Sequence, residues 1–187
     1  MPITELAILS LSHPHTTLTP NLKETFLQAT AAQAAWSSYP VYLFSESGPD
    51  PGDGQGASTV YLVSGWDSVD AHYEWIKSEE NQRWMKELGQ WLGEVQLRHL
   101  DFAFEKEGLD VACVVVEERV EAEEKAEGAG WSAVGKDLED LESGYHQLTA
   151  YPDANALAAL EEPAEGETRV VLKRIWSSDS NGDKGTV

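Results

Sequence analysis

The chain has 187 residues, of which 41% are hydrophobic, and 33 acidic against 13 basic residues give a formal net charge of −20. A chain of this length buries a core for one domain or two small ones without cross-links. The negative charge repels phosphate backbones and anionic membrane surfaces, so we expect neither nucleic acid nor a membrane as a partner.

The single cysteine, Cys113, lies in an apolar run and has no second cysteine with which to form a disulfide, which favours a reducing compartment and a packing role. The N-terminal stretch has no cationic region before its apolar residues and contains Glu5, unlike a secretory signal. No apolar run is long enough to span a membrane. We therefore expect a cytoplasmic protein.

The first half of the chain alternates between strand and helix patterns. Apolar residues recur at every second position in three segments, which predicts strands over 5–13, 40–47 and 58–66. Between the first two, residues 22–36 repeat apolar positions at helical spacing and stop before Pro40, as the residue ahead of a proline requires. The glycine-rich loop 48–58 lacks the Lys-Ser/Thr of a phosphate-binding loop.

The stretch GWDSVDAHYEWIKSEENQRW, residues 65–84, predicts a helix capped by Asp67 or Ser68. Its apolar stripe changes near Ser78, so we expect the helix to break there and restart, with Gly93 at its end. A fourth strand follows over residues 95–104. The order βαββαβ is that of the ferredoxin-like split βαβ unit.

The second half repeats this order in shorter form. We expect strands at 109–118, 145–151 and 168–176, a helix at 152–162, and a helix-like segment at 131–143. The acidic run 117–127 is typical of a solvated helix or linker. LTAYPDANAL, from Leu148, aligns with VSGWDSVDAH, from Val63, which indicates a divergent tandem repeat. The predicted organisation is one ferredoxin-like half over 1–106, a second over 107–177, and a disordered tail over 178–187.

The strand YLVSGW followed by DSVDAHYEWIKSEENQRW resembles the dimeric α/β-barrel superfamily and, within it, the antibiotic-biosynthesis-monooxygenase-like (ABM-like) proteins. The resemblance covers about the first 105 residues in motif and the remainder in topology. It implies an α+β fold in which two ferredoxin-like units pack sheet to sheet as a barrel, here either a single-chain pseudo-dimer or a homodimer. This fold hosts oxygenases, heme degraders and cyclases, so the resemblance identifies the fold better than the activity.

The known activities of the family place different residues on this helix. By alignment with the heme degraders, Trp75 falls at the position of the tryptophan that distorts the porphyrin, but Met85 stands where the iron-ligating histidine should be. In the plant polyketide cyclases of this fold, Trp75 and Asn81 occupy the positions of the catalytic tyrosine and histidine, and neither side chain is a base near neutral pH. Cofactor-independent oxygenases need less: an apolar pocket, a base, and exclusion of water.

The candidate catalytic residues are His72, His99 and Asp101. His72 falls on the buried side of its helix, where it is either a packed neutral histidine or a general base for a phenol or enol. His99 and Asp101 lie two apart on one strand and share a face, so the carboxylate can orient the imidazole unless both are simply exposed. The candidate substrate-binding residues are aromatic or amide side chains: Tyr42, Phe44, Tyr61, Trp66, Trp75, Asn81 and Trp84.

We expect neither a metal nor an organic cofactor. His13 and His15 can be read as a metal pair, but Pro14 interrupts the strand and no third ligand is evident, so loop histidines are the simpler interpretation. Two hypotheses for function remain. The first is an oxygenase or cyclase acting on an aromatic or polyketide-like substrate in an apolar barrel cavity. The second is a non-catalytic scaffold or carrier of a small hydrophobic molecule.

Overall fold

The computed structural model describes residues 1–12, 18–46, 59–111, 113–121, 128–152, 157, 160 and 162–178. Its centre is an eight-stranded sheet in the order β4-β1-β3-β2-β8-β5-β7-β6, in which every neighbouring pair is antiparallel. The strands are β1 (Ile3–Leu11), β2 (Val41–Glu46), β3 (Thr59–Trp66), β4 (Leu92–Leu100), β5 (Cys113–Arg119), β6 (Trp131–Lys136), β7 (Tyr145–Tyr151) and β8 (Thr168–Ser177). Together with its helices, this sheet confirms the predicted α+β class.

The three longer helices each begin after a hydroxyl residue that caps the first turn. α1 (Pro20–Ser37) starts with a proline after Thr19, whose hydroxyl accepts a hydrogen bond from the backbone of the first turn. Ser78 caps the end of α2 (Val69–Lys77) and the start of α3 (Glu79–Leu88), so the predicted helix break is confirmed. α4 (Lys106–Leu109) is a single turn between the two halves of the chain.

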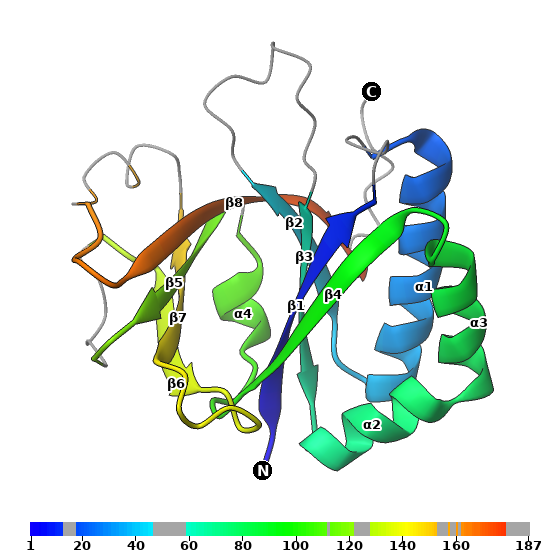
Figure 1. Ribbon diagram of the computed structural model, residues 1–187, viewed down its shortest axis with the longest axis horizontal. Helices are drawn as coiled ribbons and strands as arrows, with labels where there is room; N and C mark the ends of the chain where they lie inside the picture. Colours follow the sequence, from blue (N-terminus) through cyan, green and yellow to red (C-terminus); the bar gives the residue numbers. More distant parts are fainter. Residues whose placement is uncertain are drawn as a thin grey trace.

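The sheet curls until its two edge strands meet at one end (Figure 1). There Leu100 of β4 forms an isolated antiparallel bridge with Asp137, which follows β6. The first four strands take the order 4-1-3-2 of their own numbering, and β5 to β8 take the same order within their half. β2 and β8 join the two halves in the middle of the sheet.

The two faces of the sheet pack against different partners. On β1, Leu6 belongs to an inner cluster inside the curl, which also holds residues of β5, β7, β8 and α4. The next residue, Ala7, belongs to an outer cluster with Leu22 and Phe26 of α1. This alternation follows from the period of two along a strand. Helices α1, α2 and α3 therefore cover the outer face of the first half, as Figure 1 shows.

Several local predictions were wrong. Residues 131–136 form strand β6, not a helix, because all of them pair with residues 145–150 of β7. α3 ends at Leu88 with Gly89 as its cap, and β4 already begins at Leu92, so Gly93 lies inside that strand. β5 begins only at Cys113, later than the predicted strand over 109–118, although residues 117 and 118 of the acidic run do belong to it as that prediction has them. Three of the predicted features lie outside the described residues: the histidines 13 and 15, the loop 48–58 and most of the helix 152–162.

Candidate functional site

A cavity of about 390 Å³ lies between the three long helices and the outer face of the sheet. Its size is that of a small-molecule site. Met85 and Val95 are exposed lining residues, whereas Glu5 and His72 are buried, so the cavity opens beside α3 and β4 and ends in a polar wall. The remaining lining residues are mostly apolar: Ala7, Leu9, Phe26, Ala29, Thr30, Gln33, Leu62, Trp75, Ile76, Asn81, Gln82, Trp84, Leu88, Leu92 and Leu97.

This cavity lies on the outer face of the sheet, whereas the sequence predicted a cavity inside the barrel. The inner cluster, with buried side chains from both halves such as Tyr42, Phe44 and Leu148, packs within the curl. Two of the residues that line the cavity from the sheet and from α1, Ala7 and Ala29, are small, which leaves room on the outer face.

Glu5 forms the polar end of the cavity. It sits in an apolar strand, and only 4% of the residue is exposed. Its Oε2 accepts hydrogen bonds from Trp66 Nε1 at 2.6 Å and Gln33 Nε2 at 2.8 Å. Burial outweighs these bonds and raises the pKa of the Glu5 carboxyl from 4.5 to about 7. A carboxyl with such a pKa accepts or gives up a proton near neutral pH.

His72 lies against Glu5 and stacks on Trp66. Its Nε2 is 3.6 Å from Glu5 Oε1, and the imidazole and indole centroids are 4.4 Å apart. Its other nitrogen, Nδ1, is 2.7 Å from Nε2 of His99, which is fully buried. Burial, with a contribution from His99, lowers the pKa of His72 from 6.5 to about 3, so the imidazole is neutral at rest.

The second half of the chain supplies the carboxylate that faces His99. Glu139, in the turn after β6, places Oε2 at 2.5 Å from His99 Nδ1. Its Oε1 accepts a hydrogen bond of 2.5 Å from the hydroxyl of Tyr73. Hydrogen bonds from Tyr73 and His99 outweigh partial burial and keep the pKa of Glu139 below its ordinary value. Glu139 is 40% exposed at its side chain, so this end of the network reaches solvent.

The turn that carries Glu139 is held by Asp137, which is 2% exposed. Asp137 Oδ1 accepts hydrogen bonds from the backbone N–H of Glu139 and that of His99, at 3.1 and 3.3 Å. The first is an Asx turn, in which an aspartate bonds to its own backbone two residues on. Asp101 of the segment after β4 also holds this part of the chain, because its Oδ1 accepts a hydrogen bond from Lys136 N at 2.8 Å.

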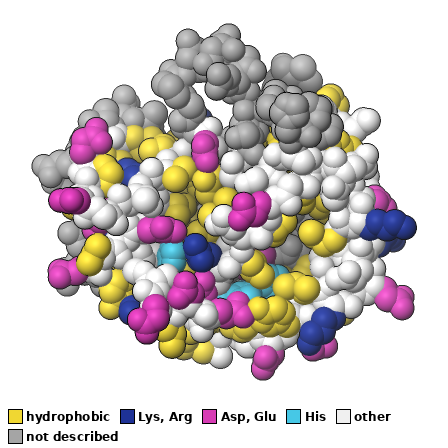
Figure 2. Space-filling model, in the orientation of Figure 1, with side chains coloured by type: hydrophobic (Ala, Val, Ile, Leu, Met, Phe, Trp, Pro, Cys, Tyr) yellow, Lys and Arg dark blue, Asp and Glu magenta, His cyan; other side chains and the backbone are white. Residues whose placement is uncertain are grey.

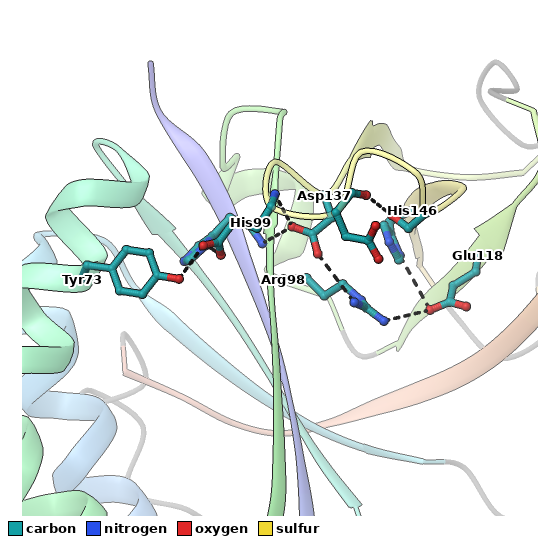
Figure 3. A network of polar contacts seen from close by, with 9 residues as sticks. Tyr73, Arg98, His99, Glu118, Asp137 and His146 are labelled. Atoms are coloured by element: carbon teal, nitrogen blue, oxygen red, sulfur yellow. Dashed lines mark hydrogen bonds and ion pairs between the residues drawn. The ribbon is translucent and has the colours of Figure 1, made fainter.

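A second polar group lies on the other side of Asp137, as Figure 3 shows. Arg98 reaches Asp137 Oδ2 at 3.6 Å and Glu118 at 3.7 Å, and His146 faces Glu118 at 3.9 Å. Burial lowers the pKa of His146. The neighbouring positions Leu100 and Leu148 belong to the inner cluster, so Arg98 and His146 point into the curl, away from the cavity.

The structure brings together some of the predicted site residues. His72, Trp75, Asn81 and Trp84 line the cavity, and His99 contacts His72. Asp101 is exposed and bonds to a backbone amide; the carboxylate beside the His99 ring is Glu139 instead.

The predicted aromatic residues of β2 and β3 divide between the faces of the sheet. Trp66 stacks on His72, whereas Tyr42, Phe44 and Tyr61 belong to the inner cluster on the opposite face. Sequence reasoning missed Glu5, Gln33, Tyr73 and Glu139 as site residues. Only Glu5 carried a visible signal, because an acidic residue inside an apolar strand is rarely buried without a partner.

Within the described ranges, no group of three or more His, Cys, Asp and Glu side chains is arranged to hold a metal ion. The same part of the chain contains no helix with both the length and the apolar character to cross a membrane. Figure 2 shows acidic side chains spread over the viewed face with few basic ones, in keeping with the net charge.

No family model matches the chain, and no curated protein matches it in sequence. Solved structures do match. A provisionally named monooxygenase from Fusobacterium nucleatum subsp. nucleatum is 12% identical with a TM-score of 0.65, over 100% of this chain and 96% of that one. A protein described as anthrone oxidase-like is 14% identical with a TM-score of 0.61, over 94% and 92%.

A second provisionally named monooxygenase, from Lactobacillus acidophilus, is 8% identical with a TM-score of 0.59, over 94% of this chain and 95% of that one. Each of these single chains thus covers both halves of the sheet. At such identities the likeness shows the fold alone, and that fold is consistent with the dimeric α/β-barrel type.

Proposed function

We propose that this protein is a small-molecule enzyme that removes a proton from an aromatic or polyketide-like substrate held in the outer cavity. The observation that carries the proposal is the pairing of a buried carboxyl, Glu5, with a buried imidazole, His72, at the closed end of an apolar cavity. Titratable groups with strongly perturbed pKa values in a concave apolar site are typical of acid–base catalysis.

The chemistry is of the cofactor-independent monooxygenase or cyclase type. An electron-rich aromatic compound that loses a proton becomes an anion able to reduce O₂, and oxidation of an activated methylene balances as CH₂ + O₂ → C=O + H₂O. A cyclase uses the same anion to attack a carbonyl within the substrate, without an oxidant. In both cases the apolar walls, including Trp75 and Trp84, stack on the substrate and keep water from the anion. Asn81 supplies a neutral hydrogen-bonding group.

The names of structural neighbours add modest support, because two are provisionally monooxygenases and a third is described as anthrone oxidase-like. We also propose that the chain is a tandem pseudo-dimer of ferredoxin-like halves, 1–106 and 107–177, that works in the cytoplasm as a monomer or as a homodimer. The shared strand order 4-1-3-2 supports this, as does the alignment of Trp66 with Tyr151, which end the third strand of each half.

The test uses anthrone as substrate and measures O₂ consumption by the full chain without added metal or cofactor. We expect turnover that falls by on the order of 100-fold or more in His72→Ala, the usual loss for a general acid–base group. His146→Ala is the matched control, because His146 is also buried with a lowered pKa but points away from the cavity. Equal turnover in His72→Ala and the wild type would refute a role for His72.

A carrier of a small hydrophobic molecule is the second candidate. The observation in its favour is the low pKa of His72, about 3, which makes this imidazole a weak base by itself. Binding of anthrone without any O₂ consumption or cyclisation would favour the carrier over the enzyme.

A further inference from the structure

A series of polar contacts, three of them at hydrogen-bond distance, runs from the cavity to the surface: Glu5, His72, His99 and Glu139, ending at Tyr73. We propose that Glu5 is the group that takes the proton from the substrate, and that His72 and His99 pass it to Glu139 at the surface. This relay rests on the proposed function, since it supplies that reaction with its base and its proton exit.

Two proton arrangements of the network hold the same number of protons. In the first, Glu5 is protonated, His72 and His99 each carry a proton on Nδ1, and His99 Nδ1–H donates to the Glu139 carboxylate. In the second, Glu5 has given its proton to His72 Nε2, and His72 Nδ1 has passed its own to His99 Nε2. His99 is then doubly protonated beside Glu139, which stabilises the cation.

Each transfer moves one proton between neighbours and keeps the total charge of the network constant. Two of the contacts are at hydrogen-bond distance: the imidazoles of His72 and His99 are 2.7 Å apart, and His99 is 2.5 Å from Glu139. The remaining step, from Glu5 Oε1 to His72 Nε2, spans 3.6 Å and requires a small approach of the two side chains.

The groups around Glu5 allow it to switch between states. Trp66 of β3 and Gln33 of α1 donate hydrogen bonds to Oε2 in both protonation states of Glu5. The charge of protonated His99 on β4 favours the Glu5 carboxylate. Among the cavity-lining residues that the structure describes, none is Lys or Arg. The lining therefore favours a substrate that enters as a neutral weak acid, a phenol, enol or activated methylene, over a carboxylate or phosphate.

The relay gives the second half of the chain a part in the site. Glu139 reaches His99 only because the edge strands β4 and β6 meet, through the Leu100–Asp137 bridge and the Asx turn at Asp137. The first half alone would leave the fully buried His99 without its carboxylate.

The proton acceptor is tested with 2-naphthol, a neutral weak acid whose excited state gives naphtholate emission when a base beside the bound probe, or water around the unbound probe, takes its proton. We expect the bound probe to give naphtholate emission in the wild type. In Glu5→Gln we expect that emission to be lost while binding, read from the total emission, is retained. Bound 2-naphthol with unchanged naphtholate emission in Glu5→Gln would overturn the assignment of Glu5.

The relay is tested without substrate, by following nitrogen resonances of the isotope-labelled protein against pH. The indole N–H of Trp66 reports ionisation of Glu5, and the His99 ring reports its own protonation. If the two share a proton through His72, both signals change along one curve with one midpoint. Independent midpoints in the wild type overturn the relay.

Glu139→Gln removes the charge that stabilises doubly protonated His99, so the His99 signal should stop following that of Trp66. Glu142→Gln, an exposed acid in the following turn, is the matched control and should leave the shared midpoint intact. A shared midpoint that survives in Glu139→Gln overturns the exit through that residue. Failure of 2-naphthol and anthrone to bind would count against the proposed function and leave the resonance test of the relay unaffected.

Discussion

Replacing Glu5 by Gln should stabilise the protein at neutral and alkaline pH but not at acidic pH. Glutamine has the shape of a protonated glutamic acid and keeps an oxygen for the hydrogen bond from Trp66. The wild-type protein must bury a carboxylate above the pKa of Glu5, whereas the variant buries a neutral amide at every pH. The difference in the free energy of unfolding between the two proteins therefore isolates the ionisation of Glu5.

The sign and size follow from the raised pKa. The folded protein binds the Glu5 proton more tightly than the unfolded chain, so this contribution to stability is complete below pH 4.5 and is lost as the pH rises through about 7. Moving a pKa from 4.5 to about 7 corresponds to about 3 kcal/mol, at about 1.4 kcal/mol for each pH unit. That is a large part of a typical domain stability of about 5–15 kcal/mol.

Urea unfolding of both proteins at a series of pH values from 4 to about 8.5 measures this difference. We expect the advantage of Glu5→Gln over the wild type to grow by about 3 kcal/mol between pH 4.5 and the alkaline end. Glu142→Gln serves as the exposed control and should show no such growth. Parallel stability curves for wild type and Glu5→Gln would refute the raised pKa and, with it, a Glu5 poised near neutrality.

Two further changes probe the same part of the fold. In the Glu5→Gln background, the free energy of unfolding should fall as the pH drops from about 6.5 toward about 3, because the unfolded chain protonates His72 and the folded protein does not. Adding His72→Gln should reduce this pH dependence in the same urea series. Gly65→Ala should cost about 1–3 kcal/mol in urea unfolding, since its new methyl group would lie 2.4 Å from Tyr39 and 2.7 Å from Phe104; Gly128→Ala is unsuitable as a control because its φ is +76°.

Local patterns were sufficient for most of the fold. Alternation along 5–13 and 58–66 predicts strands that the sheet contains, and the change of apolar stripe at Ser78 predicts the point where α2 ends and α3 begins. These features depend on residues close together in the chain, so periodicity and capping report them directly.

The segment 131–143 was misread because its second part, DLEDLES, spaces leucines three apart as a helix would. Its first part, WSAVGK, became β6 because the backbone of β7 needed a hydrogen-bonding partner on that side. Pairing across a sheet overrides a weak local preference, since strand propensity depends on context more than helix propensity does.

The location of the cavity was harder to predict than the residues that line it. The spacing of His72 from Val69 and Ile76 correctly placed its side chain on the buried side of α2. Whether that side faces a hollow depends on the volumes of residues on separate elements, such as Ala7 and Ala29. No pattern within one element reports the space between two of them.

Glu139 illustrates what local reasoning lacks, because it is 40 residues from His99 and on the other half of the chain. Their contact follows from the curl of the whole sheet, which no segment encodes alone. Glu5, in contrast, could have prompted a search for partners, since a carboxyl in the middle of an apolar strand is costly to bury alone. A proton exit explains why such a costly group would be kept there: desolvation brings its pKa near neutrality, and His72 and His99 connect it to the only solvent-facing carboxylate along that path.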